Sequence, residues 1–491
     1  MPAGFSIQDF QYILPEIVLT AGALLLLVVD LLTSRQQQRV LGWCALAVLG
    51  ATALTLLPFS GANLVVSRGL LAIDGFAFFF KLIFLGSAAI TILMSSSYLE
   101  AEGLKAGEYY FLILCATLGM MFMASGIDLI AIFIGLETMA VAFYILAGYV
   151  KPNRRSNEAA VKYFLLGAFS LGLLLYGMSL LYGLSGTTNL RELSATFVAG
   201  ESDALLLVAM ILVIAGIGFK IAAVPFHMWA PDVYEGAPTP VTAFLSVGSK
   251  AASFAMLIRI FFEGLPGLVE EWRPIFYALA IITMTMGNIA AITQSNIKRM
   301  LAYSSIAHAG YILIGVVAGT PRGFTAIFVY LMVYVFMQLG AFAVVSMLRR
   351  ENVAGDELKD LSGLYFRYPV AAFAMLFFML SLGGIPPTAG FMGKFWLFSA
   401  AIESGYVWLA VVAVGNSAIS LYYYIRVIVY MWIKEEIAGP PIRVSPAMVA
   451  ALVITLVGTI VFGLYPRPLF ELAAASTQVI REPVIVGSLF Y

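Results

Sequence analysis

The segment GFKIAAVPFHMWAPD at residues 218–232 interrupts an apolar run with a proline and carries a lysine and a histidine. A second such segment, SLGGIPPTAGFMGKFW at residues 381–396, has two prolines followed by a lysine. Proline removes a backbone donor and clashes with the preceding turn, so broken helices are predicted near Pro225 and near Pro386 and Pro387. Broken helices are typical of transport paths, where protein or water satisfies the freed backbone groups. A simple proline kink is the alternative for either segment alone.

The rest of the chain indicates that both breaks lie in a membrane. Of 491 residues, 62% are hydrophobic and 11% charged, against roughly 25% charged in an ordinary soluble domain. A helix needs about 20 apolar residues to cross the hydrocarbon core. Fourteen such segments lie near 11–33, 40–58, 73–99, 109–124, 126–150, 157–183, 204–235, 240–263, 273–294, 297–319, 322–348, 369–402, 406–433 and 444–465. The sequence therefore predicts an all-α integral membrane protein with about fourteen transmembrane helices, the seventh and twelfth discontinuous.

The two breaks are five helices apart, which fits two inverted five-helix repeats formed by helices 4–8 and 9–13. No polar or low-complexity stretch is long enough for a separate soluble domain. We therefore expect a single polytopic membrane domain over residues 1–491. Its expected parts are the first three helices (1–108), the first repeat (109–263), the second repeat (273–433) and the last helix (444–465).

Lys and Arg are distributed unevenly between alternate connections, and cytoplasmic loops are enriched in them. The odd-numbered connections hold fourteen: Arg35, Arg39, Lys105, Lys151, Arg154, Arg155, Lys298, Arg299, Arg349, Arg350, Lys359, Arg367, Lys434 and Arg443. The even-numbered connections and the termini hold six: Arg68, Arg191, Arg273, Arg322, Arg467 and Arg481. Both termini are therefore predicted to face away from the cytoplasm.

The composition excludes several classes of function. Lys+Arg and Asp+Glu both number 27, so no basic excess indicates a nucleic-acid partner. The cysteines are Cys44 and Cys115 and the histidines are His227 and His308. They are too few and too scattered for an iron–sulfur cluster, a zinc site or a disulfide framework. No metal or cofactor site is therefore expected in this chain, and any redox chemistry is expected on another subunit.

A small set of ionisable residues lies inside the predicted helices, where each costs about 2.5–3.5 kcal/mol on insertion scales. They are Glu137 in the fifth helix, Lys162 in the sixth, Lys220 in the seventh, Lys250 in the eighth, His308 in the tenth and Lys394 in the twelfth. Loss of water disfavours a charged lysine and a nearby carboxylate favours it again, which makes a switchable proton site. Glu137 is the expected counter-charge, and His308 suits a relay between lysines. Water between them can be held by Tyr144, Tyr303, Ser304 and Ser305.

Other charged residues have plainer explanations. Lys81, Arg259 and Arg426 lie within about two turns of a predicted helix end, so we expect them to extend to the membrane interface. Lys162 has Glu158 one turn before it, and a structural ion pair is its alternative.

Plainer alternatives also exist for the central residues. His227 follows the first break and can serve only to satisfy freed backbone groups. For Glu137, Lys220 and Lys250, the alternative is a static buried ion pair that fixes helix packing.

Five motifs resemble those of the antiporter-like subunits of respiratory complex I, the NADH:quinone oxidoreductases. They are GLETMAVAFYILAGY at 135–149, NEAAVKYFLLGAFSLG at 157–172, GFKIAAVPFHMWAPDVYEGAPTPV at 218–241, KRMLAYSSIAHAGY at 298–311 and GGIPPTAGFMGKFWLF at 383–398. The 218–241 motif is shared by the wider antiporter family. The M-type paralogue usually carries glutamate at the position of Lys394, so this lysine sets the chain apart from that paralogue.

The resemblance implies roles for the same ionisable positions. The family's helix-5 glutamate falls on Glu137, the lysines of helices 6, 7 and 8 on Lys162, Lys220 and Lys250, the helix-10 histidine on His308 and the helix-12 lysine on Lys394. The half from Glu137 to Lys220 resembles a cytoplasmic input, while His308 and Lys394 resemble an output toward the periplasm. The residues expected to support this relay are Pro225, His227, Tyr144, Tyr303, Pro386 and Pro387.

The expected function is that of a proton-translocating subunit in a membrane arm, driven by NADH oxidation and quinone reduction elsewhere in the assembly. NADH, FMN, iron–sulfur clusters and quinone are expected on partner subunits, with lipid and K-type and M-type subunits as neighbours. The expected location is a bacterial inner membrane, with both termini periplasmic. A subunit of a cation/proton antiporter or of a membrane-bound hydrogenase is the competing interpretation, because those share the 218–241 motif. A structural spacer that does not pump is another.

Overall fold

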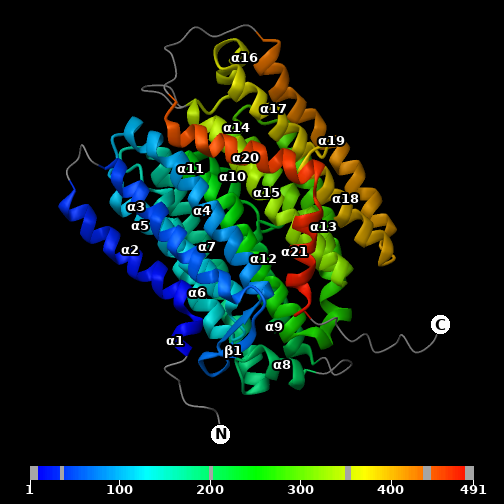
Figure 1. Ribbon diagram of the computed structural model, residues 1–491. Coiled ribbons are helices and arrows are strands. Elements are labelled where there is room, and N and C mark those ends of the chain that lie inside the picture. The colour runs from blue at the N-terminus through cyan, green and yellow to red at the C-terminus, as the bar shows by residue number, and fades with distance from the viewer. Residues whose placement is uncertain (1–8, 34–37, 198–202, 349–354, 435–443, 481–491) are drawn as a thin grey trace.

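Long helices packed side by side, with short connections at both ends, form the bundle in Figure 1. The computed structural model describes residues 9–33, 38–197, 203–348, 355–434 and 444–480. Five residues of the charge count lie outside the described residues, namely Arg35, Arg349, Arg350, Arg443 and Arg481.

Twenty-one α-helices and two strands are described. The helices are α1 (Asp9–Tyr12), α2 (Leu14–Leu32), α3 (Arg39–Leu56), α4 (Gly75–Ala101), α5 (Gly107–Ser125), α6 (Leu129–Ala147), α7 (Arg154–Ser185), α8 (Leu190–Thr196), α9 (Ala204–Ile221), α10 (Trp229–Gly236), α11 (Thr239–Phe244), α12 (Lys250–Ile258), α13 (Val269–Ile292), α14 (Ile297–Ala318), α15 (Pro321–Met347), α16 (Leu364–Arg367), α17 (Pro369–Gly383), α18 (Ala389–Glu403), α19 (Val407–Trp432), α20 (Pro446–Leu464) and α21 (Arg467–Thr477). The strands are β1 (Asn63–Val66) and β2 (Leu71–Asp74). Turns of π-helix at Leu245–Ser249 and Arg259–Gly264 make α11 and α12 parts of one continuous helix, Thr239–Gly264.

Every predicted transmembrane segment contains a helix. Within the described residues, 13 helices are long and apolar enough to span a membrane. The remaining predicted segment, the twelfth, consists of the shorter helices α17 and α18 on either side of its break. The prediction of an all-α, multi-pass membrane protein is therefore confirmed.

The first break separates α9 from α10, and the backbone leaves the helix at Ala222 with φ +58°. The Val224 N–H donates to Thr283 Oγ1 of α13 (3.0 Å). The Trp229 indole N–H donates back across the break to the Phe219 carbonyl (2.8 Å). Backbone groups near the break therefore find partners inside the protein, as apolar surroundings require.

The second break separates α17 from α18. Gly384 adopts φ +83°, a left-handed conformation that glycine takes without strain. The Gly390 N–H donates to Ser381 Oγ (3.0 Å), which joins the two half-helices. Both breaks lie where the proline motifs predict them.

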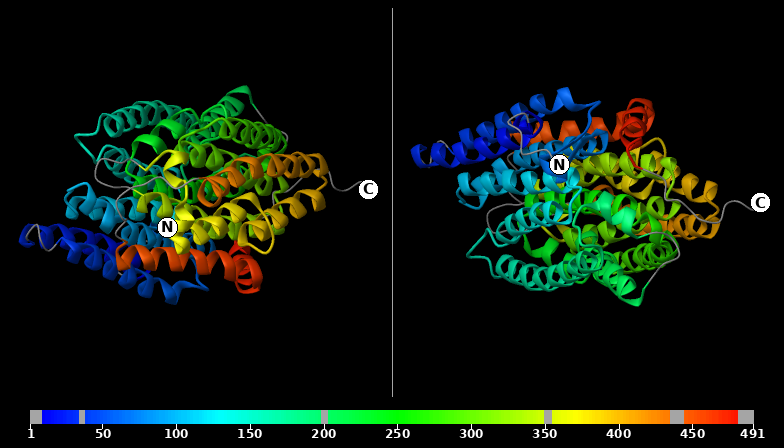
Figure 2. Two further views of the ribbon diagram at one scale, coloured as in Figure 1. Left: turned by 90° about the horizontal axis from the view of Figure 1, so that it is seen from above. Right: turned by 90° about the horizontal axis from the view of Figure 1, so that it is seen from below.

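The helices differ in how deeply they lie in the bundle. Thr239–Gly264 is buried along its length, and α14 and α15 are nearly so. In contrast, α2, α3, α7 and α20 bury only part of their surface, as helices do when they face lipid or a neighbouring subunit. Figure 2 shows α2 and α3 at one edge of the bundle, with α20 on the same side. The central helices are thus the ones that carry Lys250 and His308.

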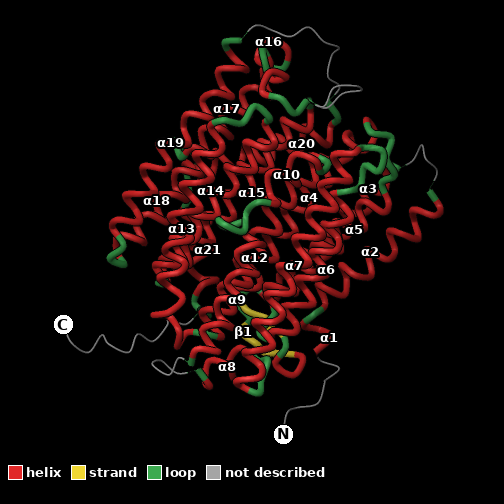
Figure 3. The backbone as a smooth tube through the Cα atoms, turned by 180° about the vertical axis from the view of Figure 1, so that it is seen from behind, coloured by secondary structure: helices red, strands yellow, loops and turns green. Residues whose placement is uncertain are grey.

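A small antiparallel hairpin was not predicted from the sequence. β1 pairs with β2 in the register Asn63↔Asp74, and the turn between them uses positive φ at Arg68 and Gly69 (57° and 88°). Figure 3 shows the hairpin near α8 at one end of the bundle. Strands of four residues are too short to show a clear alternating pattern, which explains why the hairpin was missed.

Candidate functional site

Six helices carry the six predicted ionisable residues. Glu137 is on α6, Lys162 on α7, Lys220 on α9, Lys250 on α12, His308 on α14 and Lys394 on α18. The side chains on α9, α12, α14 and α18 belong to residues at most 3% exposed, and Glu137 is half-buried. The Lys162 side chain is 42% exposed. Five of the six therefore lie inside the bundle and one lies at its surface.

Lys220 lies in the last turn of α9, directly before the first break. Its ammonium donates to the Tyr144 hydroxyl of α6 (3.4 Å). Glu137 lies two turns earlier on the same face of α6 and interacts electrostatically with Lys220. Glu137 Oε1 is buried and has no hydrogen-bond partner among the described residues. Tyr144 therefore links Lys220 to the helix that carries the unpartnered carboxylate.

Lys162 is not paired with Glu137. Its ammonium forms ion pairs with Glu158, one turn earlier on α7, and with Asp232 of α10, both at 2.8 Å. Asp232 also accepts from Arg299 of α14 (2.7 Å). The structural pair with Glu158 is thus present, and Asp232 extends it to two further helices.

Lys250 is held by α14. Its ammonium donates to the Ser305 hydroxyl (2.6 Å) and to the Ser305 carbonyl. Ser305 Oγ lies 3.5 Å from the Tyr234 hydroxyl of α10, and the Tyr334 ring centroid of α15 lies 5.6 Å from the ammonium. A lysine of the first predicted repeat is therefore bonded directly to a helix of the second.

Both ring nitrogens of His308 have a tyrosine partner. Nδ1 bonds the Tyr330 hydroxyl of α15, and Nε2 lies 3.1 Å from the Tyr424 hydroxyl of α19. The Tyr424 hydroxyl also bonds Ser304 Oγ (2.5 Å). Because hydroxyls both donate and accept, these bonds can reverse direction when the imidazole gains or loses a proton.

The Lys394 ammonium reaches back from α18 across the second break. It donates to two carbonyls at the C-terminal end of α17 (3.0 and 3.1 Å) and to Ser417 Oγ of α19 (2.9 Å). The C-terminus of a helix attracts cations. The same ammonium lies 4.8 Å from the Tyr311 ring centroid, and that ring lies 5.7 Å from the His308 ring. Tyr311 therefore contacts both His308 and Lys394.

These groups form a line of proton donors and acceptors inside an apolar bundle. In the described part of the chain, no carboxylate forms an ion pair with Lys220, Lys250 or Lys394, whose ammonium groups are held by hydroxyl and carbonyl oxygens. Lys250 and Lys394 can each give up a proton without leaving a carboxylate unpaired. Gln338 of α15 is fully buried, and neither polar atom of its amide has a partner among the described residues. Such atoms are typical sites of buried water.

Known proteins match this region. The family model described as "NADH:quinone oxidoreductase/Mrp antiporter, TM" matches residues 126–420. The chain belongs to this family. The matched range contains both helix breaks and all six predicted ionisable residues.

Individual members of the family match almost from end to end. NADH-quinone oxidoreductase subunit N 1 of Koribacter versatilis is 46% identical over 507 residues, covering 100% of this chain and 99% of that protein. A chain of respiratory complex I from Thermus thermophilus, solved with bound aureothin, is 34% identical with a TM-score of 0.79, covering 94% of this chain and 99% of that one. A chain of the Mrp complex from Dietzia sp. DQ12-45-1b has a TM-score of 0.85 at 24% identity, covering 98% of each. The last likeness shows the shared fold alone.

The predicted supporting residues differ in their surroundings. Pro225, Pro386 and Pro387 are exposed at the two breaks. His227 is half-buried, and its Nδ1 has no hydrogen-bond partner among the described residues. The half-buried Tyr303 has its ring centroid 6.0 Å from the Arg299 guanidinium. Tyr303 therefore lies beside the ion pairs of Asp232.

Several polar residues of the site were not singled out from the sequence. They are Asp232, Tyr234, Tyr311, Tyr330, Tyr334, Ser417 and Tyr424. Lys298, counted as a loop residue, is 3% exposed and donates to two carbonyls at the C-terminal end of α10 (2.7 and 2.8 Å). Tyrosine and serine occur in many helices of this chain. Their positions in the sequence therefore do not indicate which of them lie next to the lysines. Asp232 lies inside the 218–232 motif and could have been identified there.

Lys81 and Arg259 do not extend to an interface, contrary to expectation. Lys81 is 2% exposed and pairs with Glu16 of α2 (2.6 Å). Arg259 is fully buried and makes two bonds to Asp74 at the start of α4 (2.8 and 2.9 Å). Arg426 is half-buried and donates to backbone carbonyls at the C-terminal end of α13. The prediction failed for Lys81 and Arg259 because it counted only the distance to a helix end. Glu16 and Asp74, both distant in sequence, pair with these two cations, and Glu263 one turn later also pairs with Arg259.

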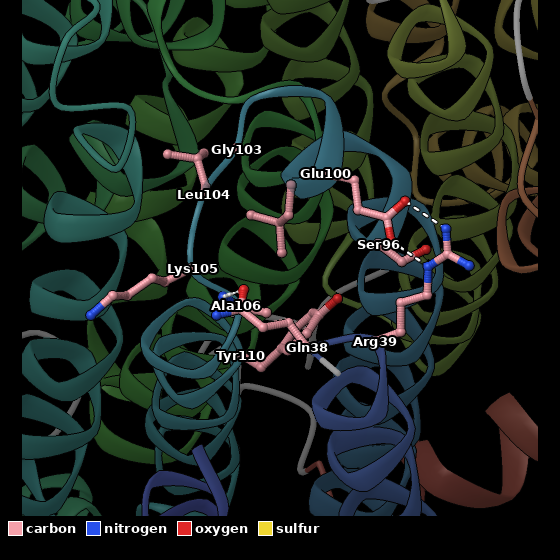
Figure 4. A pocket seen from close by; sticks show the side chains of 10 residues that line it. Gln38, Arg39, Ser96, Glu100, Gly103, Leu104, Lys105, Ala106 and Tyr110 are labelled. Atoms are coloured by element: carbon pink, nitrogen blue, oxygen red, sulfur yellow. Dashed lines mark hydrogen bonds and ion pairs between the residues drawn. The ribbon is translucent and has the colours of Figure 1, made fainter. Parts of the chain in front are cut away.

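A pocket at the ends of α3, α4 and α5 contains none of the six predicted relay residues and none of their predicted supporting residues (Figure 4). Arg39 of α3 and Glu100 of α4 point toward each other there and form an ion pair. The described residues also hold no group of three or more His, Cys, Asp or Glu placed to bind a metal.

Proposed function

We propose that this chain is subunit N of a bacterial NADH:quinone oxidoreductase, respiratory complex I, and that it translocates protons across the membrane. The relative from Koribacter versatilis and the complex I chain from Thermus thermophilus support the assignment. The observation that carries the function is the set of buried lysines and His308 inside the bundle, each bonded to a hydroxyl group of another helix.

Protons enter at the cytoplasmic end of the first half. A proton that reaches Glu137 neutralises the carboxylate, and Lys220 then loses the attraction that helps to hold its own proton. Tyr144, which accepts from Lys220 (3.4 Å), is placed to take part in the transfer. The break after α9 opens the helix at this point, so water can reach the ammonium where a continuous helix would exclude it.

The proton then crosses between the two halves. Lys250 donates to Ser305 Oγ (2.6 Å), and a hydroxyl can accept one proton while giving up another. Buried water joins Ser305 to the hydrogen-bonded set of Ser304, Tyr424 and His308. His308 interacts electrostatically with both Lys250 and Lys394, so a proton arriving at either lysine changes the field at the imidazole.

Lys394 forms the output. Its ammonium is held by carbonyls beside the second break and by Ser417, so release of the proton toward the periplasm must be driven. The driving force comes from a neighbouring subunit that responds to quinone reduction. This subunit is thereby part of a translocase, while NADH, FMN, iron–sulfur clusters and quinone are bound by partner subunits.

The proposal includes the domain organisation, location and orientation that the sequence predicts. The chain is one membrane domain in the bacterial inner membrane, with both termini periplasmic and K-type and M-type subunits as neighbours. Inverted repeats over 109–263 and 273–433 place the two breaks toward opposite sides of the membrane. Access from opposite sides at the two ends makes the path a lateral relay.

The competing assignments make different predictions. A cation/proton antiporter or a membrane-bound hydrogenase requires a gene cluster of that kind, whereas subunit N requires a cluster of complex I genes. The identity of 46% to a subunit N over 100% of this chain favours complex I over the Mrp likeness at 24% identity.

The test is proton pumping by the assembled complex in sealed vesicles. Glu137→Gln and Lys220→Ala should each lower the number of protons moved per NADH oxidised by quinone. A structural spacer predicts an unchanged ratio in both variants, and that result would remove the proposed function.

A further inference from the structure

The Asp232 carboxylate is shared between cations from the two predicted repeats. Oδ2 accepts from Lys162 of α7 (2.8 Å), and Oδ1 accepts from Arg299 of α14 (2.7 Å). Asp232 itself lies on α10, the short helix beyond the first break. One carboxylate therefore connects the three helices α7, α10 and α14.

α10 is bonded to α14 at further points. Lys298 of α14 donates to two backbone carbonyls at the C-terminal end of α10 (2.7 and 2.8 Å). The Tyr234 hydroxyl of α10 lies 3.5 Å from Ser305 Oγ of α14, the atom that accepts from Lys250. A non-helical segment separates α10 from α9, the helix that carries Lys220, and the Trp229 indole N–H bonds the Phe219 carbonyl across it. A displacement of α10 is thereby passed to α14 at the bond that holds Lys250.

The ion pairs of Asp232 are suited to rearrangement. The Lys162–Asp232 pair lines a hollow of about 170 Å³ together with Arg155 and Glu235, and the Asp232 side chain is 33% exposed. Each partly exposed ion pair is worth about 0–1 kcal/mol, and Asp232 forms two of them. Loss of the Asp232 charge would break the pairs with Lys162 and with Arg299 at once, and so remove a link between α7 and α14.

We propose that Asp232 is a positioning residue that joins α7, α10 and α14 and so sets the contact between Lys250 and Ser305. This inference deepens the proposed function and rests on it. It also assigns Lys162, which is not paired with Glu137, to positioning these helices at the entrance of the relay.

The test compares two acids that bind the same lysine. Asp232→Asn and Glu158→Gln each remove one partner of Lys162, but Glu158 lies on the same helix as Lys162 and so provides no link from α7 to α14. In vesicles containing the whole complex, Asp232→Asn should lower the pumping rate about tenfold, within the usual range of coupling between sites. Glu158→Gln should lower it by less than about twofold. Asp232→Glu should restore most of the rate. NADH oxidation by an artificial electron acceptor monitors assembly of the complex independently of pumping.

An exchange variant separates the link to α14 from the pair with Lys162. Lys162→Asp combined with Asp232→Lys keeps the pair but places a cation beside Arg299. The inference predicts that pumping stays low, because the bond to α14 is replaced by repulsion. Recovery of wild-type pumping would show that only the pair matters and would overturn it. This variant also serves if Asp232→Asn does not assemble.

Other outcomes are equally decisive. Equal effects of Asp232→Asn and Glu158→Gln on pumping would overturn the inference. So would a double variant, Asp232→Asn with Arg299→Gln, whose effect is the sum of the two single effects, because residues in direct contact act non-additively. Lys250→Ala in the same preparation distinguishes the two levels of the account. If Lys250→Ala pumps normally, the proposed function fails. If it does not pump while Asp232→Asn does, only the role of Asp232 fails.

Discussion

Lys250 donates a 2.6 Å hydrogen bond to the Ser305 hydroxyl, joining the fully buried helix Thr239–Gly264 to α14. The two residues are 55 positions apart in the sequence and belong to different predicted repeats. Both are nearly inaccessible to solvent, at 3% and 1% exposure. The bond is therefore the point at which a proton held by the first half can pass to the second.

Ser305→Ala should lower proton pumping about tenfold. The substitution leaves the Ser305 carbonyl to hold the ammonium but removes the hydroxyl, and a bond to a charged group is worth about 1.5–3 kcal/mol. Ser253→Ala is the matched control, because Ser253 is also buried on α12 but bonds only the Ser249 carbonyl of its own helix (2.7 Å). Equal pumping by the two variants would show that the Ser305 hydroxyl carries no proton.

Tyr424→Phe should slow pumping with little loss of stability. The ring keeps its packing, while His308 Nε2 and Ser304 lose their common partner. Its neighbour Tyr423 is equally buried, and the Tyr423 hydroxyl donates to Asn288 Oδ1 (2.8 Å). Tyr423→Phe should cost about 0.5–1.5 kcal/mol of stability and keep a near-normal pumping rate. Loss of pumping in Tyr423→Phe alone would contradict the assignment.

Asp74→Asn should destabilise the subunit by about 3 kcal/mol or more, because it leaves the charge of buried Arg259 partly uncompensated. The measurement is the temperature at which the subunit is lost from the purified complex. Arg39→Gln breaks an ion pair that is exposed at both residues, and it should leave that temperature unchanged. Equal shifts would indicate that burial of the Asp74–Arg259 pair has no consequence.

Gly384→Ala should slow proton pumping, whereas Gly405→Ala, with a similar cost in stability, should not. A Cβ at Gly384, where φ is +83°, would lie 2.8 Å from Lys394 Cδ. Gly405 has a similar φ of +85°, but a Cβ there meets nothing within 4 Å. Both alanine variants should cost about 1 kcal/mol for the left-handed backbone. Only Gly384→Ala should slow pumping, and a similar loss in Gly405→Ala would attribute the effect to strain.

The sequence predicts the parts of this fold that local physics determines. A run of about 20 consecutive apolar residues can be identified as a membrane-spanning helix without any information about neighbouring helices. A proline beside a lysine likewise predicts a break wherever the helix lies, as at Pro225 and Lys220. These features account for the helix count and for both discontinuous helices.

Pairings between distant helices are what the sequence does not reveal. Arg259 lies close to a helix end, but it is buried and forms an ion pair with Asp74, which is 185 residues away in the sequence. Lys162 has an obvious local partner in Glu158, yet its second partner, Asp232, is 70 residues away. Tyr424 is one of 24 tyrosines, and only the packing of α19 against α14 places it beside His308. Such contacts depend on tertiary packing, which cannot be inferred by inspecting a single sequence.

The measurement that tests the central claim most directly is the number of protons moved per NADH oxidised by the assembled complex carrying Lys250→Ala. Lys250 lies between the two halves of the line, so its loss should interrupt transfer whichever group receives the proton first. The account predicts a lower ratio than in the wild type, with NADH oxidation by an artificial acceptor unchanged. A wild-type ratio in an assembled complex with Lys250→Ala would contradict it.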